Sequence, residues 1–273
     1  MMNASYAAAT TGSARLLDLR DTNPAPERSV GARTIGDPLE TRLIVHAEAD
    51  PVFVEQYRRL GAALHHAQIQ TGIRSVMVAS AIAAEGKTLS ATNLALTLSR
   101  FNKRVLLVDG DLRKPSIHEL LQLENGVGLT DMLNGPGELT PAHTLSPTLS
   151  VITGGYHECD PVALLVSDAV NQFFAKAREQ FDWVVVDTPP IVLFPDAGLF
   201  AERLDTCVMV VSAATTASPV AAAARDAVGS SRILGVVLNR AEVSEVAAGY
   251  GYGGYGDTTS RPGPFARWRS GRS

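Results

Sequence analysis

The chain has 273 residues, of which 45% are hydrophobic and 19% are charged, and its formal net charge is −4. This composition is ordinary for a soluble globular protein, and the length allows one large α/β domain or two small ones. The charge gives no reason to expect nucleic acid as the main partner. Two cysteines, Cys159 and Cys207, stand far apart without metal-ligand spacing and are interpreted as reduced thiols.

Residues 1–45 mix Ala, Thr, Ser, Pro and scattered charges without periodicity, which predicts a flexible leader. No basic stretch followed by an apolar core occurs there, so no signal peptide is expected. The folded part, residues 46–242, is predicted to open with a helix at Asp50 and Pro51, a capping residue followed by proline. Apolar residues then recur along one face of this helix, at Phe53, Tyr57, Leu60 and Leu64.

Short apolar runs then alternate with helical segments. The predicted strands are 75–80, 104–109, 149–153, 183–187, 207–211 and 233–238, and predicted helices include 88–100 and 161–180. Strands that are apolar throughout predict a mostly parallel sheet covered on both faces, so we expect a doubly wound α/β domain of the P-loop NTPase type. The uncharged stretch 206–224 contains Pro219 between a β-branched half and an alanine-rich half. We therefore expect strand, turn and helix there, and no membrane span.

Residues 81–88, Ala-Ile-Ala-Ala-Glu-Gly-Lys-Thr, lie between a predicted strand and a predicted helix. In a P-loop, backbone N–H groups surround the β-phosphate and the helix N-terminus adds its positive end. Gly86 would let the chain approach the phosphates, Lys87 would reach the β- and γ-phosphates, and the Thr88 hydroxyl would bind Mg²⁺. Ala81 stands where the general pattern has a glycine. We expect Lys87 to face solvent when no nucleotide is bound.

Two predicted strands end in aspartate. Asp109 closes the run Val-Leu-Leu-Val-Asp, and Asp187 closes the run Trp-Val-Val-Val-Asp. In an open parallel sheet, ligands bind beyond the carboxyl ends of the strands, where the P-loop also lies. Carboxylates at that edge can hold Mg²⁺ or accept a proton from an attacking hydroxyl. An aspartate can also end a strand simply by capping a turn.

Taken together, these motifs resemble those of the bacterial tyrosine kinases of capsule and exopolysaccharide synthesis, in the form whose cytoplasmic kinase is a separate chain. The pattern of that family is a P-loop, a strand ending in Asp-x-Asp-x-Arg and a strand ending in Asp-x-x-Pro. Its counterparts here are residues 81–88, Asp109-Gly-Asp111-Leu-Arg113 and Asp187-Thr-Pro-Pro190. The resemblance extends over about residues 50 to 256.

The resemblance implies binding of ATP and Mg²⁺. It implies that Asp109 takes the proton of the acceptor tyrosine, that Asp111 and Asp187 organise the metal, and that Asn239 lies near the adenine. The implied catalytic residues are Lys87, Asp109, Asp111 and Asp187, and the implied metal ligands are Thr88, Asp109 and Asp187. The implied nucleotide-binding residues are Ala81, Ala84, Glu85, Gly86, Lys87, Thr88, Leu89 and Asn239.

Three of the six tyrosines, Tyr250, Tyr252 and Tyr255, stand among glycines in a predicted flexible tail, residues 243–273. The resemblance implies that this cluster is the phosphoacceptor and that a neighbouring subunit of a homo-oligomer phosphorylates it. It further implies activation by the cytoplasmic end of a membrane-anchored protein that controls polysaccharide chain length. The chain would then be cytoplasmic and associate with the inner face of the membrane through that partner.

The chain departs from the family pattern at two places. Ala83 and Ala84 stand where the family loop usually has Pro-Gly, and Gly61 stands where the helix motif Glu-x-x-Arg-x-x-Arg has its last arginine. Two other functions stay open. One is a regulatory ATPase of the partition and septum-positioning class, which has a signature lysine at the position of Ile82. The other is a nucleotide-binding scaffold without catalysis.

Overall fold

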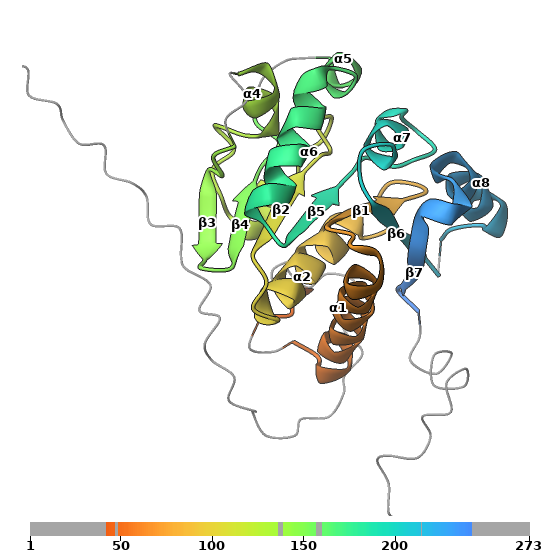
Figure 1. The fold of residues 1–273 in the computed structure, drawn as a ribbon. Helices are drawn as coiled ribbons and strands as arrows, with labels where there is room; N and C mark the ends of the chain where they lie inside the picture. Colours follow the sequence, from red (N-terminus) through yellow and green to blue (C-terminus); the bar gives the residue numbers. More distant parts are fainter. Residues whose placement is uncertain (1–41, 47–48, 136–138, 157–159, 214, 242–273) are drawn as a thin grey trace, which may run out of the picture. The chain divides into compact units, whose positions relative to one another are not determined.

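The computed structural model describes residues 42–46, 49–135, 139–156, 160–213 and 215–241. The predictions for most of the leader, for Cys159 and for the tyrosines of the tail lie outside these residues. Within the described ranges, the chain folds into a sheet with helices on both faces (Figure 1).

One sheet of seven strands runs through the described part of the chain in the order β3-β4-β2-β5-β1-β6-β7. All neighbouring strands are parallel except β3, which pairs antiparallel with β4 at one edge. The strands are β1 (Ser75–Ser80), β2 (Val105–Asp109), β3 (His143–Ser146), β4 (Leu149–Ile152), β5 (Trp183–Asp187), β6 (Thr206–Ser212) and β7 (Ile233–Asn239). The predicted strands are all present, and β3 was not predicted.

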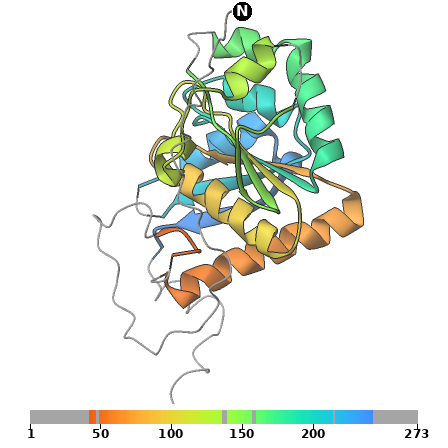
Figure 2. The ribbon, with the colours of Figure 1, turned by 90° about the vertical axis from the view of Figure 1, so that its left-hand side faces the viewer.

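The helices divide between the two faces of the sheet, as Figures 1 and 2 show from two directions. One face carries α1 (Pro51–Thr71), α2 (Lys87–Arg100) and α3 (Ile117–Leu121). The other face carries α4 (Leu129–Asn134), α5 (Pro161–Leu165), α6 (Asp168–Gln180), α7 (Asp196–Ala201) and α8 (Ser218–Val228). A short 3-10 helix, η2 (Ser230–Arg232), precedes β7. The doubly wound α/β fold is therefore confirmed.

The local signals explain where the elements begin. The Asp50 carboxylate accepts the Val52 amide at 2.8 Å and Pro51 is the first helical residue, as the capping pattern predicts. Every residue of β1, β2 and β5 is buried, which explains why these strands read as continuous apolar runs. Residues 206–213 and 215–224 include β6, a turn and the first part of α8, as predicted. No helix in the described ranges is both long and apolar enough to cross a membrane.

Two boundaries differ from the sequence-based expectation. The single helix predicted over 161–180 is wrong, because the chain breaks between α5 and α6. Ser167 is extended, with φ −72° and ψ 157°, and its hydroxyl donates to the Leu164 carbonyl at 2.7 Å. The packed chain also begins upstream of residue 46. Leu43 and Ile44 are buried beside α2, and the Ile44 amide donates to Asn93 Oδ1 at 2.9 Å.

Candidate nucleotide-binding site

The phosphate loop joins β1 to α2 at the carboxyl edge of the sheet. Two of its residues have positive φ, 64° at Ala84 and 92° at Gly86. A Cβ atom on Gly86 would lie 2.3 Å from Asn239 Nδ2, so glycine is needed there. Asn239 Nδ2 also donates to the Glu85 carbonyl at 2.7 Å. The last residue of β7 therefore lies against the phosphate loop, whose residues the sequence analysis placed with Asn239 in the nucleotide-binding set.

The side chain of Glu85 holds the loop in shape. It is only 1% exposed, and its Oε2 accepts the Ile82 amide at 2.8 Å. Its Oε1 accepts the Ser212 amide at 3.1 Å and the Thr216 hydroxyl. One carboxylate thus connects both ends of the loop to the last residue of β6 and to the turn that follows it. Sequence reasoning grouped Glu85 with the nucleotide but found no role for Ser212 or Thr216, because neither belongs to a local motif.

Lys87 lies between two carboxylates. Its Nζ is 3.1 Å from Asp111 Oδ2 and 3.3 Å from Asp187 Oδ1, and the residue is only 9% exposed. The expectation that Lys87 faces solvent is therefore wrong, because the carboxylates of Asp111 and Asp187 draw the ammonium group inward. Burial lowers the pKa of Lys87, but the charges of Asp187 and Asp111 outweigh it and the net shift is upward.

Thr88 is bonded to the same carboxylate. Its hydroxyl donates to Asp187 Oδ2 at 2.6 Å and lies 3.2 Å from the hydroxyl of Ser116. Burial raises the pKa of Asp187, although the Lys87 charge and the Thr88 hydroxyl oppose the shift. Ser116 was missed by sequence reasoning. Its position just before the helical segment Ile-His-Glu-Leu-Leu is a helix-capping signal that could have identified it.

Asp109 is fully buried beside this group. Its Oδ2 accepts the amides of Ser116 at 2.8 Å and Ile117 at 2.9 Å, at the start of α3. Asp109 and Asp187 are register partners on the paired strands β2 and β5. Burial, and then the charge of Asp187, raise the pKa of Asp109 to about 7, although the backbone donors and Lys87 act in the opposite direction. A carboxyl group with this pKa can take up and release a proton near neutral pH.

The arginine of the Asp-x-Asp-x-Arg motif also forms an ion pair. Arg113 donates to both oxygens of Asp196, at 2.8 and 2.9 Å, and its guanidinium lies over the ring of Phe194. This bidentate pair connects the chain after β2 to the start of α7. The chain after β5 also runs beside the phosphate loop, because the Val192 amide donates to the Ala81 carbonyl at 3.2 Å.

Two of the predicted nucleotide-binding residues direct their side chains into the protein. Ala81 is fully buried in the core on the α6 side of the sheet, and Leu89 packs against the core on the α2 side. These residues can meet a nucleotide only through the backbone. This arrangement suits a P-loop, whose phosphate contacts are largely backbone N–H groups.

The acidic residues suit a magnesium ion better than a metal held by protein ligands alone. No group of three or more His, Cys, Asp and Glu side chains in the described ranges is arranged to hold a metal. Asp187, with the Thr88 hydroxyl bonded to it and Asp109 in register beside it, offers two carboxylates and one hydroxyl. Mg²⁺ is commonly bound by one or two carboxylates, and phosphate oxygens and water complete its shell. The predicted donor set therefore fits Mg²⁺ bound together with a nucleotide.

Comparison with known proteins assigns the family. Residues 73–248 match ParA, described as NUBPL iron-transfer P-loop NTPase. Tyrosine-protein kinase YwqD of Bacillus subtilis (strain 168) is 34% identical over 226 residues, which are 81% of this chain and 95% of YwqD. Tyrosine-protein kinase wzc of Salmonella typhi is 32% identical over 222 residues, which are 79% of this chain and 30% of wzc.

A solved structure agrees with these sequence relatives. The kinase domain of the Escherichia coli tyrosine kinase ETK has a TM-score of 0.66 and 28% identity to this chain, and the match covers 79% of this chain and 86% of that domain. The partition and septum-positioning ATPases share only the broader ParA-like fold. With its P-loop and both acidic strand ends in one site, the chain belongs to the bacterial tyrosine-protein kinases, on the ParA-like P-loop NTPase fold.

Proposed function

We propose that this tyrosine kinase autophosphorylates: it transfers the γ-phosphoryl group of MgATP to Tyr250, Tyr252 and Tyr255 of the same protein. The observation that carries the proposal is the cluster at the carboxyl edge of the sheet. There Lys87 and Thr88 are bonded to Asp187, and Asp109, with a pKa near neutrality, lies in register beside it.

In the proposed complex, backbone N–H groups of the phosphate loop bind the phosphates, and Lys87 turns from its carboxylate partners to the β- and γ-phosphates. The Thr88 hydroxyl and Asp187 would hold Mg²⁺, with Asp109 beside them as the second carboxylate, and Asp111 would orient Lys87 and the metal shell. Bound Mg²⁺ supplies positive charge against the γ-phosphate and the leaving ADP. Asn239, whose amide nitrogen donates to the Glu85 carbonyl, would contact the adenine.

Asp109 is the proposed base. The acceptor tyrosine oxygen forms a bond to the γ-phosphorus while the bond from that phosphorus to the ADP oxygen breaks, and the tyrosine proton passes to Asp109 and then to solvent. The raised pKa supports this role, since the carboxylate is a stronger base than an ordinary aspartate and is still ionised above about pH 7.

We further propose that the kinase regulates capsular or exopolysaccharide synthesis and export. Membership of the tyrosine-kinase family is the argument for this process. It is also the argument for a membrane-anchored chain-length or co-polymerase protein as the activator, at the inner face of the membrane. Phosphorylation between subunits of a homo-oligomer is the proposed route. A tail in the site of a neighbour need not fold back on its own domain.

Intact-mass analysis of the full chain after incubation with MgATP tests the proposal. The kinase gains multiples of one phosphate, which a chain lacking the three tail tyrosines does not. Release of phosphate without a gain in mass would show a regulatory ATPase, and neither change would show a scaffold. A Lys87→Met chain mixed with an active chain that lacks the tail tyrosines is expected to gain phosphate. If the Lys87→Met chain stays unmodified, each tail serves its own active site.

A further inference from the structure

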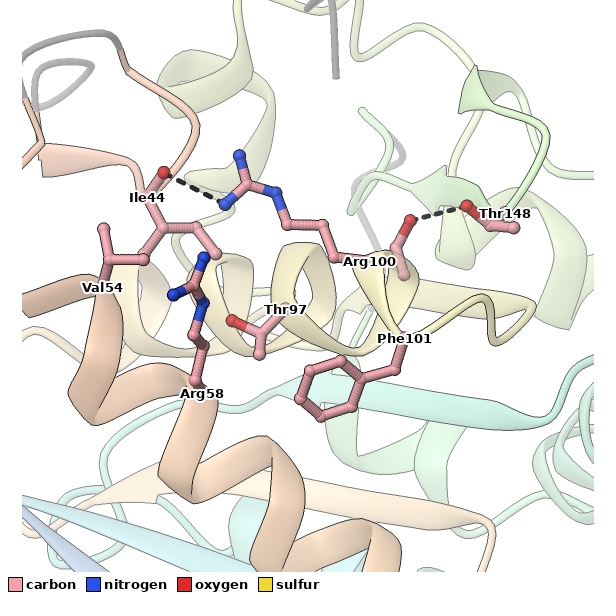
Figure 3. Close-up of a pocket in the computed structure, with 8 residues that line it drawn as sticks. Ile44, Val54, Arg58, Thr97, Arg100, Phe101 and Thr148 are labelled. Carbon is pink, nitrogen blue, oxygen red and sulfur yellow. Dashed lines mark hydrogen bonds between the residues drawn. The ribbon is translucent and has the colours of Figure 1, made fainter. Parts of the chain in front are cut away.

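A pocket of about 430 Å³ lies between α1, the C-terminal end of α2 and the turn between β3 and β4 (Figure 3). Arg58 from α1 and Arg100 from the end of α2 line it together with the side chains of Ile44, Val54 and Phe101. Lys87 and Arg100 are the first and last residues of α2, so about 20 Å of helix separates this pocket from the phosphate loop. The pocket is therefore a different site from the one described above.

The two arginines have little negative charge around them. The Arg100 Nη1 atom donates to the Ile44 carbonyl at 3.4 Å, and no carboxylate of the described residues lies within 4.0 Å of Arg100. Among the described residues, Arg58 contacts one carboxylate, that of Glu55 at 3.8 Å, on an exposed surface. Burial, and then the charge of the neighbouring Arg58, lower the pKa of Arg100, because two positive charges in one pocket disfavour each other. A bound dianion would relieve that repulsion.

The rest of the lining is apolar and aromatic. Ile44 is buried against α2, and Val54 and Phe101 pack at the edge of the core on this face. The Ser99 and Thr148 hydroxyls, 2.8 Å apart, fasten the end of α2 to the turn before β4 and keep this wall in place. Arginine pairs bind phosphate groups through two parallel N–H donors, and apolar walls accept a ring. A phosphate group joined directly to an aromatic ring matches both parts of the pocket.

We propose that the pocket between Arg58 and Arg100 binds phosphotyrosine, with the phosphate on the two guanidinium groups and the ring against Phe101, Val54 and Ile44. The ligand is the product of the tyrosine kinase itself, so this inference rests on the proposed function. Because the pocket lies at the far end of α2, a phosphorylated tail bound there leaves the active site free for the next acceptor.

The test uses a synthetic peptide of residues 249–256 phosphorylated on Tyr252, titrated into the full chain and followed by calorimetry. The full chain is saturated with MgADP, so that the phosphate loop does not capture the peptide. We expect at least tenfold weaker binding of the unphosphorylated peptide. Arg100→Met is expected to weaken phosphopeptide binding at least tenfold, since it removes a charged fork and keeps the length of the side chain.

Arg104→Met is the matched control, because Arg104 pairs with Asp182 and does not line the pocket. It should leave phosphopeptide binding unchanged, and a thermal melt of each variant checks that the fold is intact. Equal binding by the Arg100→Met and parent chains would overturn the proposal. Phenyl phosphate is expected to compete better than inorganic phosphate, and equal competition would remove the role of the apolar wall. The peptide is synthetic, so its binding is independent of the mass measurement that tests kinase activity.

Discussion

Asp109 and Asp187 face each other as register partners on β2 and β5, and both are fully buried. Two carboxylates this close cannot both ionise without cost, and burial raises the pKa of each. Only Lys87 supplies a nearby positive charge to the pair among the ion pairs of the described residues. The site is therefore prepared for a cation, and its electrostatics predict how it responds to pH and to mutation.

The first prediction concerns Asp109 and stability. Its folded-state pKa of about 7 lies above the ordinary value of 3.8, so the folded state holds the proton more tightly than the unfolded state. The stability that this proton provides is fully present below about pH 4 and is lost as pH rises through 7. Asp109→Asn should therefore become more stable than the parent chain between pH 4 and 8, by on the order of 1–3 kcal/mol.

Chemical denaturation across this pH range measures the difference. Asp182→Asn is the control, because Arg104 lowers the pKa of Asp182 and this mutation should decrease stability instead.

Kinetics test the role of the same aspartate as a base. Asp109→Asn should depress the rate of phosphorylation far more than the affinity for ATP, and the rate of the parent chain should rise with pH through about 7. Asp187→Asn should instead change the Mg²⁺ requirement. If Asp109→Asn mainly shifts the Mg²⁺ requirement, the two roles are reversed.

The second prediction concerns Lys87→Met. Loss of the lysine should abolish tyrosine phosphorylation and sharply weaken ATP binding. Because Lys87 is buried between Asp111 and Asp187, its loss also leaves two unpaired carboxylates and should cost about 1–3 kcal/mol of stability at pH 8. A thermal melt beside the partly exposed control Lys103→Met measures this cost. Autophosphorylation at the parent rate would refute the P-loop assignment.

The third prediction concerns the backbone at Ala84. Its φ of 64° lies in the left-handed region, where alanine is strained and glycine is not. Ala84→Gly should therefore stabilise the chain by up to about 1 kcal/mol and tighten ATP binding. Ala83→Gly is the matched control, since Ala83 has no positive φ and the change should be neutral or destabilising. Equal effects of the two substitutions in denaturant melts would show that Ala84 is not strained.

The fourth prediction concerns the Glu85 carboxylate. Glu85→Ala removes one hydrogen bond to the Ile82 amide within the loop and two that join the loop to Ser212 and Thr216. It should raise KM for ATP at least tenfold with a smaller change in kcat. Glu85→Gln keeps one acceptor oxygen, so its KM should lie between those of the parent chain and Glu85→Ala. Thr216→Val removes a single bond and should give a smaller increase in KM. Steady-state kinetics would contradict this role if KM stayed constant across the series.

The fifth prediction concerns Gly61, at the place of an arginine in the family's helix motif. A Cβ atom there would lie 2.9 Å from Thr97 Cγ2 and 3.0 Å from the Phe101 ring, so α1 and α2 touch at this glycine. Gly61→Arg should therefore cost at least about 2 kcal/mol of stability. The neighbouring Ala62→Arg, on the exposed side of α1, should cost little. A stable Gly61→Arg chain in a urea melt would show that the two helices can separate.

Sequence alone determined the elements whose signals are local. Continuous apolar runs predicted the buried strands, the Asp50-Pro51 cap predicted the start of α1, and residues 81–88 predicted a phosphate loop. Serine at position 167 is also a local signal, yet it was outweighed by the helical recurrence around it. A helix break costs only a few hydrogen bonds. The helical spacing of apolar residues can therefore continue across it and hide it in the sequence.

Tertiary structure alone decided which distant residues meet. The order β2-β5-β1 places Asp109 beside Asp187. At the other end of the same pair of strands, Arg104 bonds to Asp182, which is 78 positions away in the sequence. The burial of Lys87, the contact of Glu85 with Ser212 and the pocket between Arg58 and Arg100 likewise depend on strand order and helix packing. Local patterns record which face of an element is apolar. They do not record which neighbour covers that face. The burial and the ion pairs of the charged residues depend on that neighbour.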